Sequence, residues 1–305
     1  MGSIVQRHTV PEHTGPVRLS DYVHNVFDVL PSRKSARKAI EKRMVLVDGV
    51  PRGTGYFVKP GDLIEIISNE ISPSRIYERT LRVLYEDDSI AVVYKPPGLR
   101  TNGNQFKTLE HALPYNLYLS GAIDALPAPV PVHRLDSPTS GLVIAAKRLS
   151  SAVSLGLQFQ GREVLKRYRA VVIGAVEGNG VIHGDIDGRD AVTMYRAVRQ
   201  VRSLRNSYLT LLDLWPRTGR QHQLRKHLSG EGYPILGDPL YGTEGLVLKS
   251  KGVFLSAVEI SFRHPEKKWI LNVRVEDPEK FATYMNREER RWNRNSGIVK
   301  NGPEE

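Results

Sequence analysis

Residues 132–147 read VHRLDSPTSGLVIAAK, and the rest of the chain is organised around them. The second half, Leu142 to Ala146, is an unbroken apolar run between a glycine and a lysine, which predicts a buried strand. In the first half a single carboxylate, Asp136, stands on a tight turn that leads into this strand. Such loops often carry catalytic side chains, but an aspartate in a turn can also serve only to cap backbone amides. On these residues alone, both interpretations of Asp136 stay open.

Length and composition limit the architecture and the chemistry. With 305 residues the chain has room for one large domain and one small one. It has no cysteine, which excludes disulfides and thiolate chemistry. Lysine and arginine total 44 against 33 acidic residues, and the resulting charge of +11 suits a polyanionic partner. A basic surface that is merely solvated has the same balance unless its cations cluster.

Several kinds of segment and site are missing from the sequence. No apolar stretch approaches the ~18 residues of a membrane span, and residues 1–16 lack the apolar core of a signal peptide. We therefore expect a cytoplasmic protein without membrane contact. His222 and His227 stand five positions apart, not on one helix face as in a His-x-x-x-His pair, so we expect no metal site. The glycine patterns of dinucleotide and phosphate-binding loops are also absent, and we expect no cofactor.

The N-terminal part predicts a small domain over residues 17–69, after a polar leader at 1–16. Ser20 is expected to cap a helix over 21–30, and Ser32 or Ser35 a second helix that ends near 43. Strands are expected at 45–47 and 62–67. The second helix carries six cations within eleven residues: Arg33, Lys34, Arg37, Lys38, Lys42 and Arg43. Nearby acids are almost lacking, which favours a phosphate-binding face over a merely solvated one.

The remaining residues predict a linker at 70–80, a large domain over 81–285 and a charged, frayed tail at 286–305. Strands are expected at 81–85, 90–94, 142–146, 166–174, 207–215, 254–262 and 269–275, with hairpin material over 175–206. Helices are expected at 109–113, at 150–160 with Ser150 as cap, after Thr218-Gly219-Arg220, and at 278–285; the stretch that ends at Pro131 looks irregular. Strands outnumber helices and do not alternate with them regularly. We therefore predict an α+β domain around a largely antiparallel mixed sheet.

Three motifs in this domain resemble those of the RluA-type pseudouridine synthases, which isomerise uridine in structured RNA. They are His133-Arg134-Leu135-Asp136 with Thr139-Ser140-Gly141, Lys166-Arg167-Tyr168-Arg169-Ala170, and the run from Thr218-Gly219-Arg220 to His227. The resemblance implies the pseudouridine synthase fold and a catalytic role for Asp136. It also implies that Arg225 pairs with that aspartate, that Tyr168 stacks on the target base and that Leu224 packs against it. From pattern alone, the tyrosine would be a core residue and the arginine a surface cation.

An opening motif of the same family resembles residues 86–99, where an acidic turn precedes an apolar strand and the loop Lys95-Pro96-Pro97-Gly98. We expect this loop only to support the floor of the active cleft.

The small domain resembles the alpha-L RNA-binding domain first known from a ribosomal protein, with Gly61-Asp62-Leu63-Ile64 as its closing element. The glycine that usually precedes its first strand is missing, and Arg43 and Met44 stand there. The resemblance implies that the cationic helix holds RNA phosphates, which adds affinity without reading sequence. The candidate contacts are Arg33, Lys34, Arg37 and Lys38.

Residues and resemblance together predict a monomeric RNA pseudouridine synthase, with ribosomal RNA as the substrate and transfer RNA as the alternative. A uridine inside folded RNA must be flipped out, and Arg134 is our candidate for filling the gap. Two other classes of protein fit these residues less well. A non-catalytic RNA-binding or ribosome-assembly factor would not need Asp136, Tyr168 and Arg225 together. A glycoside hydrolase would want a pair of carboxylates, and only Asp136 stands in a strong motif.

Overall fold

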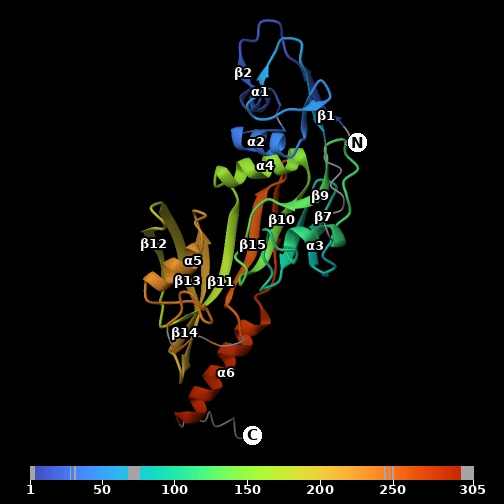
Figure 1. Cartoon of the computed structure of the whole chain (residues 1–305). Coiled ribbons are helices and arrows are strands. Elements are labelled where there is room, and N and C mark those ends of the chain that lie inside the picture. Colours follow the sequence, from blue (N-terminus) through green and yellow to red (C-terminus); the bar gives the residue numbers. More distant parts are fainter. Residues whose placement is uncertain are drawn as a thin grey trace.

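The computed structural model describes residues 4–27, 29–30, 32–67, 76–243, 245–246, 248 and 251–296, with Val5 described by its backbone alone. The buried apolar side chains of these residues form two separate cores, one for each of two domains. One set lies within residues 10–66 and forms the core of a small domain. The other lies between residues 81 and 285 and covers both faces of a large sheet. Figure 1 shows this sheet with its helices and, at the top of the view, the small N-terminal domain in blue.

The small domain has two helices and two small sheets. Its elements are β1 (Ile4–Thr9), β2 (Val17–Arg18), α1 (Leu19–Val26), α2 (Arg33–Glu41), β3 (Val45–Val47), β4 (Val50–Pro51), β5 (Phe57–Val58) and β6 (Leu63–Ile67). The strand order is β1-β6-β3-β4, and β2 pairs with β5. Ala36, Ala39 and Ile40 of α2 are buried against this core, so the apolar stripe of the helix faces inward.

The expected leader is wrong, because residues 4–9 form strand β1. This strand runs antiparallel to β6, with Thr9 opposite Leu63 and His8 opposite Ile64. The imidazole of His8 also forms a hydrogen bond with the hydroxyl of Tyr22, at 3.1 Å. The segment is polar and lacks the alternation of a strand, but it pairs with the otherwise free edge of β6. That distant partner, which local sequence does not reveal, decides its conformation.

The helix ends of this domain show which cap predictions hold. Ser20 lies inside α1 and is buried, so it does not cap that helix. Ser32 caps α2: its side chain accepts from the amide of Ser35, and the Ser35 side chain accepts from the amide of Ser32. Arg43 occupies the position of the missing glycine and has a left-handed φ of 57°. Arg43 thus adopts the backbone conformation that glycine usually has in this turn, and its side chain adds a steric cost because the left-handed region disfavours residues with a Cβ.

The large domain is α+β, as predicted. Its strands are β7 (Arg82–Glu86), β8 (Ile90–Lys95), β9 (Ala125–Pro131), β10 (Ser140–Arg148), β11 (Leu165–Ile173), β12 (Asn179–Asp185), β13 (Asp190–Ser203), β14 (Ser207–Pro216), β15 (Leu255–Arg263) and β16 (Ile270–Arg274). The main order is β12-β13-β14-β11-β15-β10-β8-β7, with β16 on β15 and β9 on β10. Neighbours pair antiparallel except β10 and β15, which pair in parallel. The helices are α3 (Leu109–Asn116), α4 (Leu149–Gln160), α5 (Gln223–Gly230) and α6 (Glu279–Asn295).

Both faces of the sheet are buried. In β8, Ile90 and Val92 pack in the cluster that contains Leu155 of α4. Ala91 and Val93 belong instead to the cluster that includes apolar residues of α3, α5 and α6. Because successive strand residues point to opposite faces, α4 covers one face and the other three helices the opposite one. The apolar run of β10 is therefore buried on both sides, as its sequence predicts.

Three expectations for this domain need correction. The irregular stretch before Pro131 contains β9, which pairs antiparallel with β10. Ser150 does not cap α4, which begins at Leu149; instead its amide donates to the Asp124 carboxylate at 3.0 Å. The charged tail is helical to Asn295, because Glu288 is buried and accepts from Ser203 at 2.8 Å. Residues 297–305, and residues 70–75 of the expected linker, lie outside the described part, while 76–80 have no regular structure.

No helix in the part of the chain described by the structure is both long and apolar enough to cross a membrane.

Candidate active site

The loop that carries Asp136 is held by backbone contacts on both sides. The hydroxyl of Thr101 accepts from the amide of Leu135 at 3.1 Å and donates to its carbonyl at 2.9 Å. The carbonyl of Ser137 accepts from the amide of Gly98 at 2.8 Å. The Asp136 side chain is 20% exposed and opens into a cleft of about 280 Å³. No described backbone amide donates to its carboxylate, so capping the turn is not its role in this fold.

Gly141 lets the loop enter the core beside β15. Its φ is +126°, and an added Cβ would lie 2.3 Å from the carbonyl oxygen of Ala257. Gly141 pairs with Ala257 in the parallel bridge between β10 and β15. A side chain at this position would force the two strands apart and would shift the start of β10. The glycine of the Thr-Ser-Gly sequence therefore fixes where the aspartate loop ends.

Lys95 ties the loop at 95–99 to the loop of Asp136. Its side chain is fully buried, and Nζ donates to the carbonyls of Pro96 (3.1 Å), Leu99 (2.7 Å) and Ser137 (3.2 Å). Burial lowers the pKa of Lys95 to about 7, against the opposing effect of the charge on Asp136. The expected supporting role of this loop thus has a physical basis in one lysine that joins two loops.

Arg225 reaches Asp136 from α5, but its fork is used elsewhere. Nη1 lies 3.6 Å from Oδ2 of Asp136. Nε and Nη2 donate to the two oxygens of Asp238, at 2.6 and 2.7 Å. The guanidinium side chain is 2% exposed and that of Asp238 0%. Arg225 therefore forms no bidentate pair with Asp136. Its two short hydrogen bonds go to Asp238, and it makes only one longer contact with Asp136.

His222 lies on the other side of the Asp136 carboxylate. It precedes α5 with a left-handed φ of 55°, and its Nε2 is 3.8 Å from Oδ1 of Asp136. Its Nδ1 forms a 2.9 Å hydrogen bond with the hydroxyl of Tyr241, whose ring centroid lies 5.0 Å from Cζ of Arg225. The sequence prediction did not include His222 or Tyr241 in the site. The signal was available, because His222 stands inside the Thr-Gly-Arg motif.

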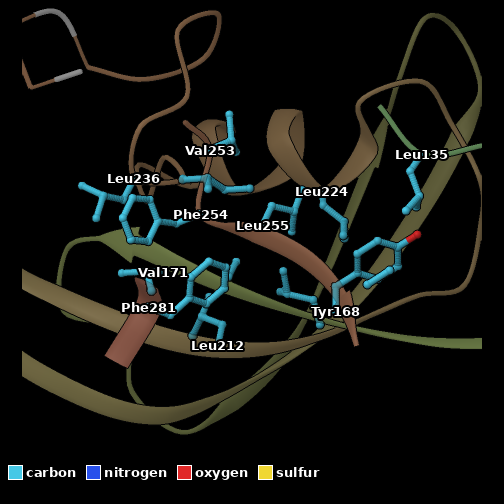
Figure 2. Close-up of a cluster of buried hydrophobic side chains, with 14 of the residues drawn as sticks. Leu135, Tyr168, Val171, Leu212, Leu224, Leu236, Val253, Phe254, Leu255 and Phe281 are labelled. Carbon is cyan, nitrogen blue, oxygen red and sulfur yellow. The ribbon is translucent and has the colours of Figure 1, made fainter. Parts of the chain in front are cut away.

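Tyr168 comes from β11 and is 9% exposed. Its ring lies at one end of a buried apolar cluster, beside Leu135 and Leu224 (Figure 2). Burial, and secondly the charge of Asp136, raise the pKa of Tyr168, so that its hydroxyl keeps its proton at neutral pH. Tyr168, Ala170 and Val172, which the sequence places on one strand face, are all buried.

The corner at Thr218-Gly219-Arg220 is built around the side chain of Gln223. Its Oε1 accepts from the hydroxyl of Thr218 at 2.7 Å and from the amide of Arg220 at 3.0 Å. Its Nε2 donates to the carbonyl of Val192 at 3.0 Å. One glutamine thereby fastens the corner to β13 and orients the start of α5, from which Leu224 and Arg225 reach the cleft.

Comparison with known proteins supports what this geometry suggests. Residues 89–230 match the family model described as RNA pseudouridylate synthase, and this range contains Asp136, Tyr168 and Arg225. Residues 28–64 match the S4 domain. The ribosomal large subunit pseudouridine synthase D of Nitrosomonas europaea is 31% identical over 292 residues, which cover 86% of this chain and 82% of that protein. The chain belongs to the RNA pseudouridylate synthase family.

Other relatives of this synthase agree. The ribosomal large subunit pseudouridine synthase C of Rickettsia prowazekii is 32% identical, over 80% of this chain and 88% of that protein. The dual-specificity RNA pseudouridine synthase RluA of Vibrio cholerae is 35% identical, over 62% of this chain and 79% of that protein. The solved structure of human RNA Pseudouridylate Synthase Domain Containing 4 has 25% identity and a TM-score of 0.54, over 68% of this chain and 92% of that one. Both the family and the fold predicted from the motifs are thus confirmed, as is the small domain of ribosomal-protein type.

The candidate RNA contacts of the synthase lie in two places. Arg134 is exposed at the cleft, and Leu224 lines it. Four cations, all exposed, lie on α2: Arg33, Lys34, Arg37 and Lys38. Arg33 is engaged in an ion pair with Asp21 at 3.0 Å. Lys34, Arg37 and Lys38 have no such partner among the described residues, so these three fit a phosphate-binding face better than Arg33 does.

Two histidines of the synthase motifs are structural. Nε2 of His133 accepts from the amide of Ile144 at 3.0 Å, and its ring packs on Phe159 with centroids 4.8 Å apart. Burial, and secondly Lys166, lower the pKa of His133 to about 3, so the ring is neutral. His227 is buried, and its Nδ1 forms a hydrogen bond with the Thr193 hydroxyl at 3.0 Å. Within the described ranges, no three His, Asp or Glu side chains are grouped so as to hold a metal ion.

Proposed function

We propose that this pseudouridine synthase isomerises uridines of large-subunit ribosomal RNA and that Asp136 is its catalytic carboxylate. One observation carries the residue assignment: among the described residues that line the cleft, Asp136 is the only acid. It faces Arg225 on one side and His222 on the other. The choice of RNA is supported by the names of the relatives from Nitrosomonas europaea and Rickettsia prowazekii.

The reaction breaks the bond between the ribose anomeric carbon and ring nitrogen 1, turns the uracil, and joins the same carbon to ring carbon 5. The proton on carbon 5 is then lost and ring nitrogen 1 gains one, so atoms and electrons balance without an oxidant. An ionised Asp136 has two ways to assist. It can attack the anomeric carbon as a nucleophile, or it can take the proton from the neighbouring ribose carbon as a base. Arg225 stabilises the charged carboxylate in either case.

The cleft suits a flipped uracil. Tyr168 and Leu224 offer apolar surface next to Asp136, and we assign to them stacking and packing against the base. The Tyr168 hydroxyl retains its proton at neutral pH, so the tyrosine is uncharged there. We therefore assign the contact with the base to its aromatic ring. We propose that the Arg134 side chain, at the cleft, fills the space that the flipped base leaves in the RNA.

The S4 domain supplies affinity in this proposal. The exposed cations of α2 bind phosphates, and the large domain carries the chemistry. The proposed boundaries put the S4 domain at 4–67, extended by β1, and the catalytic domain at 81–295, extended by α6. A monomer that acts in the cytoplasm is part of the proposal. Transfer RNA is the second candidate substrate; the relative at 35% identity is named a dual-specificity RNA pseudouridine synthase, a name that does not limit it to one kind of RNA.

Asp136→Asn tests the assignment. We expect the purified variant to form no pseudouridine in a ribosomal RNA transcript, while its thermal melt and its RNA affinity match the parent's, since the amide keeps the shape of the carboxylate. Pseudouridine mapping in total RNA, with and without the gene, identifies the substrate. Measurable product from the variant would remove Asp136 from the mechanism. A parent enzyme that modifies only transfer RNA would remove the ribosomal assignment.

A further inference from the structure

A second cleft adjoins the catalytic one. It has a volume of about 620 Å³, and it lies between the start of β11 and the end of β14. The two clefts share four lining residues: Lys166, Pro216, Thr218 and Gly219. A strand of RNA that places one base in the catalytic cleft therefore has a continuous path into the second. Nothing in the reaction itself uses this space.

The second cleft has a surplus of positive charge. Arg167 is neutralised, because it donates to Asp213 and to Glu259 at 2.8 Å each. Arg162 and Arg217 also line the cleft, both are exposed, and neither has a carboxylate partner among the residues described. The Nε of Arg217 donates only to the sulfur of Met194, at 3.1 Å. Two cations are thus free to meet an anion at this cleft.

Lys166 is a third cation, and it lies on the wall common to both clefts. Its Nζ is 5.7 Å from the ring centroid of Phe159, and no acid in the described ranges forms an ion pair with it. Burial lowers the pKa of Lys166, which means that its charged form is poorly solvated. A phosphate at this position would restore the missing interaction, since an anion stabilises a partly buried ammonium.

Trp215 gives the second cleft an aromatic surface. It lines this cleft and not the catalytic one. Its backbone is fixed on β14 opposite Met194 of β13, and Cζ of Arg196 lies 5.6 Å from its ring centroid. An indole next to unpaired cations is the usual arrangement for single-stranded nucleic acid, in which bases stack on aromatic rings and phosphates meet lysine or arginine.

We propose that the second cleft binds the nucleotide adjacent to the target uridine in the RNA strand. The base of this neighbour stacks on Trp215, and the phosphate that links it to the uridine binds Lys166. Arg162 and Arg217 interact with the next phosphates along the strand. The assignment rests on the proposed function, since only an RNA substrate brings such a neighbour.

A double-mutant cycle with modified RNA tests the stacking. Trp215→Ala is combined with two stem-loops of ribosomal RNA in which an abasic ribose replaces the nucleotide on the 5′ or the 3′ side of the target. We expect Trp215→Ala to weaken binding of intact RNA about five- to hundredfold. We expect one of the abasic RNAs to bind the parent more weakly by a similar factor. Together, the two changes should cost no more than either alone, because they remove the same contact. Trp215→Phe should retain most of the affinity and controls for a local loss of packing.

Independent losses that multiply for both abasic RNAs would overturn the stacking assignment. The phosphate contacts have their own test: Arg162→Ala and Arg217→Ala should each lower the slope of log affinity against log salt by about one. Arg82→Ala is the matched control, an exposed arginine on β7, which is the last strand of the sheet order and four places from β11. Slopes equal to the parent's for both cleft variants would overturn the phosphate contacts.

Binding and pseudouridine formation are measured on the same transcript, which separates two kinds of failure. A parent enzyme that converts its uridine without any coupling to Trp215 overturns the second cleft alone. A parent enzyme that converts no ribosomal uridine overturns the proposed function, and the neighbour in ribosomal RNA with it.

Discussion

Asp238→Asn is the substitution that tests most directly how the site is held together. Asp238 is fully buried and accepts from Nε and Nη2 of Arg225 as well as from the amides of Leu240 and Tyr241. Asparagine has nearly the same shape, but it carries no charge and presents N–H groups where one oxygen had been. Arg225 would then remain buried with Asp136 as its sole carboxylate neighbour in the described structure, at 3.6 Å.

The expected loss of stability follows from this geometry. Removing one member of a buried, hydrogen-bonded ion pair costs about 3–5 kcal/mol, because the other charge is left uncompensated. Asp136 offsets part of that cost, so we expect the lower end, about 3 kcal/mol. The single-turnover rate should also fall, by roughly ten- to a hundredfold, since Arg225 is no longer held in one orientation beside Asp136.

The free energy of unfolding is measured by urea titration with tryptophan fluorescence. All three tryptophans of the chain, Trp215, Trp269 and Trp292, lie in the large domain, so the signal reports on that domain. The control is the pair Asp238→Leu with Arg225→Met, which removes both charges and should be more stable than Asp238→Asn alone. A loss below about 1 kcal/mol for Asp238→Asn, or a double variant no better than the single one, would refute the reasoning.

The ion pair between Arg225 and Asp238 also predicts how the free energy of unfolding depends on pH. Burial raises the pKa of Asp238, but the hydrogen bonds from Arg225 and the backbone outweigh it and hold this pKa below its ordinary value. The contribution of the pair is therefore complete above the unfolded pKa of about 3.9 and is lost as the pH falls through the folded value. The stability gap between the parent and Asp238→Asn should stay constant near neutral pH and shrink in acid.

Three further predictions concern other parts of the molecule. His222→Gln should slow single turnover by roughly two- to fivefold, since it removes a 3.8 Å contact with the Asp136 carboxylate that is too long for a full hydrogen bond and is worth less than about 1 kcal/mol; an unchanged rate would mean that His222 does not act on Asp136. Arg43→Gly should stabilise the S4 domain by up to about 1 kcal/mol, because glycine removes the left-handed strain, whereas Arg43→Ala should not. Amide exchange of β3 and β6 measures this, and equal protection in both variants would contradict it. A shortened chain beginning at Ile76 should bind RNA with a shallower salt slope and keep its rate at saturating RNA; equal slopes would show that the S4 domain does not touch RNA.

The strands nearest the site are predictable because their signals are local. The apolar run of β10 and the alternation in β11 each decide a conformation without reference to distant residues. The Thr218-Gly219-Arg220 corner likewise marks the end of a strand, and β14 ends just before it, at Pro216. The same holds for α2, where the Ser32 cap and the apolar stripe lie within a few residues of one another.

Elements that depend on a distant partner could not be predicted in this way. β9 contains Pro127, Pro129 and Pro131, and prolines usually argue against a strand. It forms because β9 pairs only with β10, so its other edge needs no amide donors. In sequence, the final turns of α6 look like a charged tail. In the structure, Glu288 is buried and accepts a hydrogen bond from Ser203, a residue 85 positions earlier. In both cases the deciding contact is far away in sequence.

The arrangement of charges around Asp136 is the clearest instance, and it has a functional reason. The motifs name Asp136 and Arg225 as partners, but they do not tell which carboxylate takes the fork of the guanidinium. In the structure Asp238 accepts both short bonds, and Asp136 keeps one contact at 3.6 Å and another, to His222, at 3.8 Å. A carboxylate held by two short bonds would have its oxygens occupied when the ribose arrives. Because Asp238 fixes Arg225 instead, the positive charge stays beside Asp136 while both of its oxygens remain free to approach the sugar.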